Sequence, residues 1–200
     1  MSFRIEEKIP LPISESHALI NILKNDGLSD LYPERVISSN YLETKDFDLY
    51  KNSEEGILPR KKIRLRHYPN EENISWKLEK KISSVEGRFK TSYALSDKER
   101  QKIKMYGYID NSYGNLEELI NVTYSRKYYL FSGMRITLDT NIIYKDLKQE
   151  LVEHKEGLSV IEIKATNNVR IDYIKSLINE KTQRFSKYCN GIKALYSQLS

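Results

Sequence analysis

Short segments in which apolar and charged residues alternate run along most of the chain. The alternation is clearest in 60–68, where Ile63 and Leu65 are each flanked by cations. A period of two sends successive side chains to opposite faces of a strand. The pattern therefore predicts about eight strands, over 2–9, 35–44, 61–68, 74–82, 88–94, 122–131, 134–144 and 158–165.

Other segments have the spacing of an amphipathic helix. Ser14 is a candidate N-cap for a helix that ends near Lys24, with a buried stripe of Ala18, Leu19, Ile22 and Leu23. Ser96 and Glu99 have the spacing of a capping box, which predicts a helix to Tyr106. Further helices are expected over 47–51, 116–120, 171–180 and 186–199. Because strands and helices do not alternate regularly, the prediction is an antiparallel α+β protein of one domain, 1–200, rather than a doubly wound parallel sheet.

The composition is that of a globular protein rich in charge. Of 200 residues, 39% are apolar and 30% are charged, against ~45–50% apolar in an average domain. Fifteen tyrosines argue against disorder. The absence of a membrane-length apolar run and of a signal-peptide pattern predicts a cytoplasmic protein with no membrane segment. The single cysteine, Cys189, excludes an internal disulfide and is expected to be buried, and the three histidines match no zinc spacing.

The polar faces of the predicted strands carry cations and isolated carboxylates in place of Ser, Thr, Asn and Gln. Cations packed at the ~4.8 Å strand spacing repel one another, and a fold tolerates them more readily where an anion binds. For any single strand, a polar face in water remains the alternative. The predicted face carries eleven cations and four anions, an excess of seven positive charges, which is larger than the net charge of +5 of the chain. The eleven cations are Arg4, Lys8, Lys62, Arg64, Arg66, Lys81, Arg88, Lys90, Arg126, Arg135 and Lys164, and the four anions are Glu6, Glu79, Asp139 and Glu162.

Such a cluster predicts a ligand with several linked phosphates. Guanidinium groups grip phosphate oxygens through paired hydrogen bonds, and lysines add point charges. Glu6, Glu79 and Glu162 each stand two residues before a lysine. These carboxylates fit a divalent cation, Mg²⁺ or Mn²⁺, that bridges carboxylate and phosphate oxygens, and they argue against nucleic acid as the partner. The chain has no P-loop motif, so the sheet itself would bind the phosphates.

In chain order, these residues resemble the VTC domain, the polyphosphate polymerase domain of the CYTH-like triphosphate tunnel metalloenzymes. Glu43 stands where that family usually has Asp. The most specific likeness is Phe185-Ser186-Lys187-Tyr188-Cys189-x-Gly191, which other tunnel enzymes lack. The remaining likeness lies in Arg4-x-Glu6-x-Lys8, Ser38-Ser39-Asn40-Tyr41-Leu42-Glu43-Thr44, Lys62-x-Arg64-x-Arg66-x-Tyr68, Leu78-Glu79-x-Lys81, Val122-x-Tyr124-x-Arg126, Arg135-Ile136-Thr137-Leu138-Asp139 and Ile161-Glu162-Ile163-Lys164.

The resemblance implies a closed antiparallel β-barrel, a triphosphate tunnel of about eight strands, with its charged faces inside and helices packed outside. It implies that Glu162 binds Mn²⁺ or Mg²⁺, and Glu6, Glu79 and Asp139 are further metal candidates. The implied catalytic cations are Lys62, Arg64, Arg66, Arg126, Arg135 and Lys187. The substrate-binding candidates are Arg4, Lys8, Tyr68, Lys81, Arg88, Lys90, Tyr124, Lys164 and Ser186.

The implied reaction moves the γ-phosphoryl group of a nucleoside triphosphate onto a polyphosphate chain. Two alternatives stay open: a tunnel triphosphatase that hydrolyses tripolyphosphate or nucleotides, and a non-catalytic module that binds polyphosphate or single-stranded RNA. Any coupling to a membrane would need a protein partner, because the sequence has neither a membrane segment nor a phosphate-sensing domain.

Overall fold

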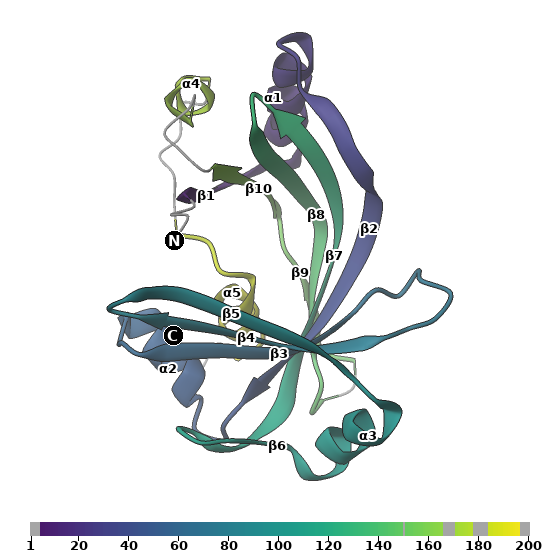
Figure 1. Ribbon diagram of the computed structural model, residues 1–200, viewed down its shortest axis with the longest axis vertical. Helices are drawn as coiled ribbons and strands as arrows, with labels where there is room; N and C mark the ends of the chain where they lie inside the picture. The colour runs from purple at the N-terminus through teal and green to yellow at the C-terminus, as the bar shows by residue number, and fades with distance from the viewer. Residues whose placement is uncertain (1–4, 150, 166–170, 178–183, 197–200) are drawn as a thin grey trace. The chain divides into compact units, whose positions relative to one another are not determined.

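The computed structural model describes residues 5–149, 151–165, 171–177 and 184–196. Figure 1 labels the elements, and their content confirms the α+β prediction. No helix in these ranges is long and apolar enough to cross a membrane. In chain order the elements are β1 (Ile5–Pro12), α1 (Ile13–Asn25), β2 (Ser29–Glu43), α2 (Asp48–Glu55), β3 (Arg60–His67), β4 (Trp76–Ser84), β5 (Gly87–Leu95), α3 (Asp97–Tyr106), β6 (Tyr108–Asp110), β7 (Gly114–Phe131), β8 (Met134–Asp146), β9 (Glu153–Lys155), β10 (Leu158–Ala165), α4 (Ile171–Ser176) and α5 (Lys187–Leu195).

The described strands form one ten-stranded sheet instead of the predicted eight. Its order is β1-β10-β8-β7-β2-β3-β4-β5, with β6 paired to β7 and β9 paired to β8. The pairs β1–β10, β10–β8, β2–β3, β3–β4, β4–β5 and β6–β7 are antiparallel, as predicted. Strands β1 and β5 are the two ends of this order in the described residues, so the pairing does not establish a closed barrel.

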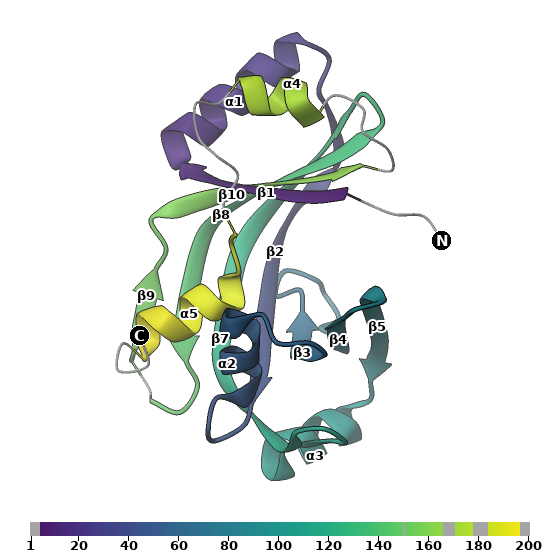
Figure 2. The same ribbon diagram turned by 90° about the vertical axis from the view of Figure 1, so that its left-hand side faces the viewer.

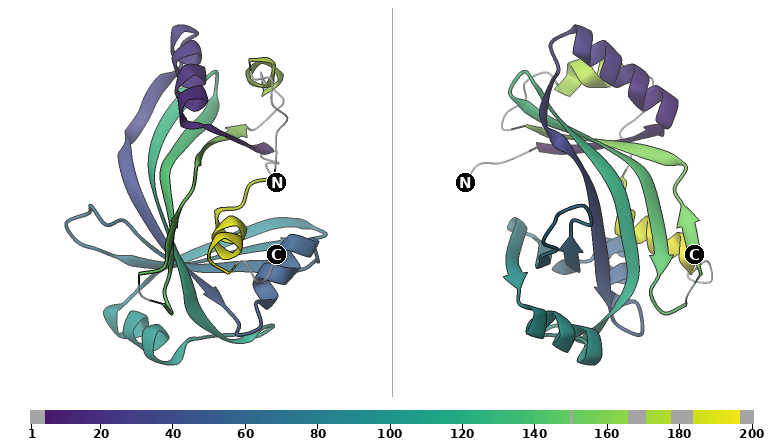
Figure 3. Two further views of the ribbon diagram at one scale, coloured as in Figure 1. Left: turned by 180° about the vertical axis from the view of Figure 1, so that it is seen from behind. Right: turned by 90° about the vertical axis from the view of Figure 1, so that its right-hand side faces the viewer.

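The chain divides into two compact units. Unit 1 contains Met1–Val36, Tyr124–Ile142 and Lys155–Phe185, and unit 2 contains Ile37–Thr123, Ile143–His154 and Ser186–Ser200. Strands β2, β7 and β8, which Figure 3 shows side by side, each contribute residues to both units.

In unit 1, helices α1 and α4 cover one face of the sheet (Figure 2), and the core between them is apolar. Helix α1 begins one residue before the predicted cap: Pro12 is its N-cap, and no side chain caps it. The buried positions are Ser16, Leu19, Ile20 and Leu23. The predicted Ala18 and Ile22 are exposed, so the buried stripe includes Ser16 and Ile20 in their place. The buried Ser16 hydroxyl donates to the Ile13 carbonyl at 2.8 Å, which satisfies its hydrogen bond inside the helix.

In unit 2, helix α2 packs against β3 and α5. The Glu43 carboxylate at the end of β2 caps α2 by accepting from the amides of Leu49 and Tyr50, each at 3.0 Å. Helix α5 packs closely, because a Cβ on Gly191 would lie 2.9 Å from side-chain atoms of Ile120 and Tyr144. Cys189 of the same helix is buried, as predicted.

One difference from the predicted elements has a clear physical reason. The predicted helix over 116–120 is wrong, because these residues belong to strand β7. Leu116 and Ile120 are both buried, and a spacing of four fits one face of a strand as well as one face of a helix. The capping box of Ser96 and Glu99 is confirmed at the start of α3. The predicted ends of the last two helices, 178–180 and 197–199, lie outside the described residues.

Candidate functional site

The predicted charged face divides between the two units. We name the part in unit 2 the basic cluster: Lys62, Arg64, Arg66, Lys81, Arg88, Lys90 and the carboxylate of Glu79. We name the part in unit 1 the mixed cluster: Lys8, Arg126, Arg135, Lys164 and the carboxylates of Glu6, Asp139 and Glu162. Arg4 lies outside the described residues. The basic cluster has six cations and one carboxylate, whereas the mixed cluster has four cations and three carboxylates. The two clusters therefore differ in their chemistry.

Strand register brings the basic cluster together. Lys62 of β3 lies opposite Lys81 of β4, which lies opposite Lys90 of β5. Arg64 lies opposite Glu79. Between these cations, Ile63 and Leu65 point the other way and are fully buried. The alternation therefore predicted the two faces of β3 correctly.

Glu79 is the shared counter-ion of the basic cluster. Its carboxylate accepts from Arg64 Nε at 2.8 Å, from Arg64 Nη2 at 2.6 Å and from Lys90 Nζ at 2.6 Å. Arg66 Nη1 lies 3.5 Å away. Burial raises the pKa of Glu79, but the charges of Arg64 and Arg66 outweigh burial and lower that pKa to about 2. Glu79 is therefore ionised at neutral pH and neutralises the cations around it.

The remaining contacts of the basic cluster connect it to α5. Lys62 Nζ donates to Ser186 Oγ at 2.8 Å and lies 5.4 Å from the centre of the Tyr188 ring. Ser186 and Tyr188 thus contact the basic strand β3 through Lys62. Arg66, only 8% exposed, donates from Nε to Ser39 Oγ at 3.1 Å. The other predicted cations of unit 2 are more exposed: Lys81, Arg88 and Lys90 are exposed, and Lys187 is half-buried.

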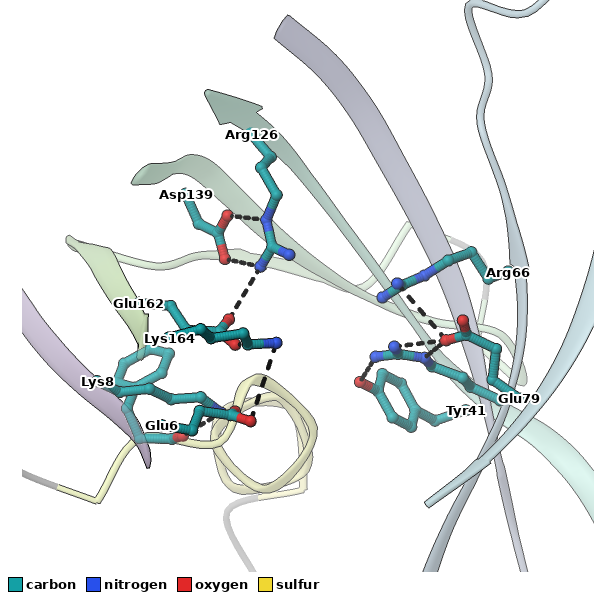
Figure 4. Close-up of polar contacts among 11 residues, drawn as sticks. Glu6, Lys8, Tyr41, Arg66, Glu79, Arg126, Asp139, Glu162 and Lys164 are labelled. Carbon is teal, nitrogen blue, oxygen red and sulfur yellow. Dashed lines mark hydrogen bonds and ion pairs between the residues drawn. The ribbon is translucent and has the colours of Figure 1, made fainter. Parts of the chain in front are cut away.

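In the mixed cluster, Arg126 of β7 joins two carboxylates, as Figure 4 shows. Its Nε and Nη2 donate to the two oxygens of Asp139 at 2.5 and 2.6 Å, and Nη2 also lies 3.3 Å from Glu162 Oε2. Burial lowers the pKa of Arg126, but the neighbouring Tyr124, Asp139 and Glu162 raise it well above its ordinary value. This guanidinium is permanently charged, and its Nε–Nη2 edge is held by the paired hydrogen bonds to Asp139.

Lys164 continues the mixed cluster from β10 to β1. Its Nζ lies 2.7 Å from Glu162 and 3.9 Å from Glu6, and Lys8 lies 3.8 Å from Glu6. Burial raises the pKa of Glu162, but Arg126, Lys164 and Lys8 hold it well below its ordinary range. Arg135 of β8 lies opposite Lys164 of β10 and is exposed.

The oxygen donors of the mixed cluster suit a hard divalent cation. Lys164 contacts both Glu162 and Glu6, so these two carboxylates share one neighbourhood. The Thr137 hydroxyl, cross-strand from Glu162, is buried and has no hydrogen-bond partner in the described chain. No three His, Cys, Asp or Glu side chains gather in the described ranges. The residues therefore fit Mg²⁺ or Mn²⁺ bound in the usual way, by one or two carboxylates with water and phosphate oxygens completing the shell.

Three site residues carried no role in the sequence analysis. Tyr41 and Ser39 contact the arginines of β3, and Glu43 accepts from the Tyr188 hydroxyl. Burial raises the pKa of Glu43 despite its hydrogen bonds. The alternation along β2 places these three residues on one face of the strand, and this much could be predicted from the sequence. Without the register between β2 and β3, the sequence could not show that this face meets the arginines.

Comparison with known proteins identifies the family. The family model of the VTC domain matches residues 3–196. The chain belongs to the VTC domain family. No curated protein sequence matches it.

Solved structures of low sequence identity share the fold of this VTC domain. A "putative adenylate cyclase" from Bacillus halodurans is 17% identical with a TM-score of 0.64, covering 98% of this chain and 100% of its own. The PH1819 protein from Pyrococcus horikoshii OT3 is 16% identical with a TM-score of 0.59, covering 96% and 99%. A chain of the Mediator head module from Schizosaccharomyces pombe is 13% identical with a TM-score of 0.50, covering 98% and 94%. These likenesses concern the fold alone.

Proposed function

We propose that this VTC domain is a metal-dependent phosphotransferase that moves the γ-phosphoryl group of a nucleoside triphosphate onto a polyphosphate chain. The basic cluster is the observation that carries the proposal. Lys62, Lys81 and Lys90 lie side by side on three strands, and Glu79 is the one carboxylate of that cluster. Such an excess of positive charge at strand spacing is stabilised by an anion of several linked phosphates.

The residues divide the work of binding by their chemistry. Arg64 and Arg66, held by Glu79, offer planar forks that match phosphate oxygens, and the lysines add point charges. Glu162 and Glu6 would hold Mn²⁺ or Mg²⁺, which supplies charge neutralisation at phosphate oxygens when bound. Transfer then rests on positioning and electrostatics, without a covalent protein intermediate.

The proposal includes the finer features that the family resemblance implies. These are a closed barrel over 1–200 as one tunnel domain, a nucleoside triphosphate and polyphosphate as ligands in preference to nucleic acid, a cytoplasmic location and a protein partner for any membrane coupling. The catalytic roles of Lys62, Arg126, Arg135 and Lys187 belong to the same proposal, as do the predicted substrate contacts of Tyr68 and Tyr124.

A product assay tests the proposed reaction directly. The protein is incubated with ATP and Mn²⁺, and the phosphate products are separated by length. Long phosphate chains support the polymerase. Orthophosphate alone would replace the proposal with a triphosphatase, and the absence of turnover with retained tripolyphosphate binding would leave a binding module.

Replacing Arg64 or Arg66 by alanine is expected to weaken tripolyphosphate binding by roughly 10- to 150-fold, because each change removes a charge-assisted contact of about 1.5–3 kcal/mol. Isothermal titration calorimetry measures the affinity. Lys102→Ala removes an exposed cation from helix α3 and is the matched control. Equal affinities of all three variants and the wild type would refute the role of the two arginines.

Pyrophosphate or polyphosphate is expected to raise the melting temperature, because a bound anion relieves repulsion within the basic cluster. A ligand at 100 times its dissociation constant stabilises the folded state by about 2.7 kcal/mol, which for a chain of this size corresponds to roughly 5–10 °C. Differential scanning fluorimetry with chloride at matched ionic strength separates this effect from screening. A flat response at millimolar ligand would count against a phosphate site.

A further inference from the structure

Tyr41 is a buried tyrosine whose hydroxyl group lies inside the basic cluster. It stands on β2 directly opposite Arg64 of β3, and its side chain is 7% exposed. Arg64 Nη1 donates to the Tyr41 hydroxyl oxygen at 2.9 Å (Figure 4). The hydroxyl is therefore placed at an arginine that the proposed function assigns to phosphate.

Two contacts hold the ring and its hydroxyl in position. The Tyr188 ring stacks on Tyr41 with centres 4.9 Å apart and planes 26° from parallel, and Tyr188 is itself held by Glu43. On the other side, Glu79 fixes the Arg64 guanidinium through Nε and Nη2. A hydroxyl held in this way needs little reordering when a ligand arrives.

The groups around the hydroxyl leave its proton without a protein acceptor in the described contacts. Arg64 donates to the oxygen, and an arginine cannot accept. The charges that act on Tyr41 are those of Arg64, Arg66 and Lys81. The nearby carboxylates are engaged elsewhere, since Glu79 binds the cations of its cluster and Glu43 accepts from Tyr188.

We propose that Tyr41 is a further substrate-binding residue, which donates its phenolic proton to a phosphate oxygen held by Arg64 and Arg66. The inference rests on the proposed phosphate site and adds a neutral donor to it. Tyr41 accepts from Arg64 and donates to the phosphate, so it links the cation and the anion in one hydrogen-bonded chain. An O–H donor to an anionic oxygen forms one of the stronger hydrogen bonds in proteins.

The ionisation of Tyr41 gives this arrangement a pH dependence. Burial raises the pKa of Tyr41, but Arg64, Arg66 and Lys81 and the hydrogen bond from Arg64 lower it to about 8. Above that pH the phenolate has no proton to donate, and its negative charge competes with phosphate for the same guanidinium groups. Affinity for phosphate is therefore expected to fall as the pH rises through about 8. The other groups that face Tyr41 are Tyr188 on α5, Glu79 on β4 and Glu43 on β2.

The test is tripolyphosphate affinity of Tyr41→Phe without metal, measured by calorimetry about one pH unit below and one above the Tyr41 pKa. The variant keeps the ring stacked on Tyr188 and loses the hydroxyl. At the lower pH we expect Tyr41→Phe to bind tripolyphosphate roughly 10-fold more weakly than wild type. Its affinity should not fall further at the higher pH, whereas the affinity of wild type should. The control is Tyr32→Phe, which changes an exposed tyrosine of unit 1 and should behave as wild type does. Identical affinity and pH profile of Tyr41→Phe and wild type would overturn the inference.

A second measurement uses the wild-type protein alone and does not depend on the folding of a variant. Phenolate absorbance near the Tyr41 pKa is expected to disappear when tripolyphosphate is added, because a ligand that needs the proton stabilises the neutral phenol. Absorbance unchanged by bound tripolyphosphate would overturn the inference. The product assay separates the two proposals. If the protein binds tripolyphosphate through Tyr41 but makes no polyphosphate, the proposed reaction is refuted and the Tyr41 contact stands. If the wild type binds no tripolyphosphate, both proposals are refuted.

Discussion

Glu162→Gln is expected to lose Mn²⁺- or Mg²⁺-dependent turnover by at least about 10²–10³-fold. Glutamine keeps the shape of the side chain but removes the anionic oxygens that fit a hard cation. The fold is expected to survive, because Arg126 retains both oxygens of Asp139 and Lys164 retains Glu6. Initial rates of phosphate-chain formation across a metal titration measure the effect.

The matched control for Glu162→Gln is Glu15→Gln, which changes an exposed carboxylate on helix α1 of the same unit. Thermal unfolding of both variants shows whether any lost turnover reflects lost structure. Wild-type rates and metal dependence in folded Glu162→Gln would remove the metal assignment from this residue.

Glu79→Gln is expected to lower the free energy of unfolding by about 3–5 kcal/mol, because removing the shared counter-ion leaves several partly buried cations uncompensated. Arg64, Arg66 and Lys90 all contact the Glu79 carboxylate. Urea denaturation at neutral pH measures the loss. Added tripolyphosphate is expected to restore much of it, since phosphate oxygens replace the missing charge.

Acid provides an independent check on the same carboxylate. The pKa of Glu79 lies at about 2 in the folded protein, below its ordinary value of 4.5. Its stabilising contribution is therefore complete above pH 4.5 and is lost as the pH falls from there through about 2. The stability difference between wild type and Glu79→Gln should shrink over this range. Glu72→Gln, which changes an exposed carboxylate of the same unit, serves as the control. A Glu79→Gln protein as stable as wild type at neutral pH would contradict the counter-ion role.

Alternation along the sequence predicted which face of a strand is buried, because that property is local. Ile161 and Ile163 are buried on β10, and Glu162 and Lys164 point to the charged face. Boundaries were less predictable. Strand β2 begins at Ser29, six residues before the predicted start at 35. The sequence could not predict this first part, because most of its side chains are exposed and show no alternation of apolar and polar residues.

The grouping of the charged residues was beyond the sequence, because it depends on strand register and order. Arg126 and Asp139 stand 13 positions apart and form the tightest ion pair of the mixed cluster through the pairing of their strands. Lys62 reaches Ser186 across 124 positions. The sequence therefore predicted one charged face, and the structure divides it into a basic and a mixed set with different partners.

The interleaving of the two units has a practical consequence for anyone who dissects this protein. The backbone passes from one unit to the other after residues 36, 123, 142, 154 and 185, and three strands are shared. No single truncation of the gene encodes either unit whole. Expression of isolated fragments should yield unfolded or aggregating polypeptides, and a defect in one cluster should not be complemented by supplying the other half in trans.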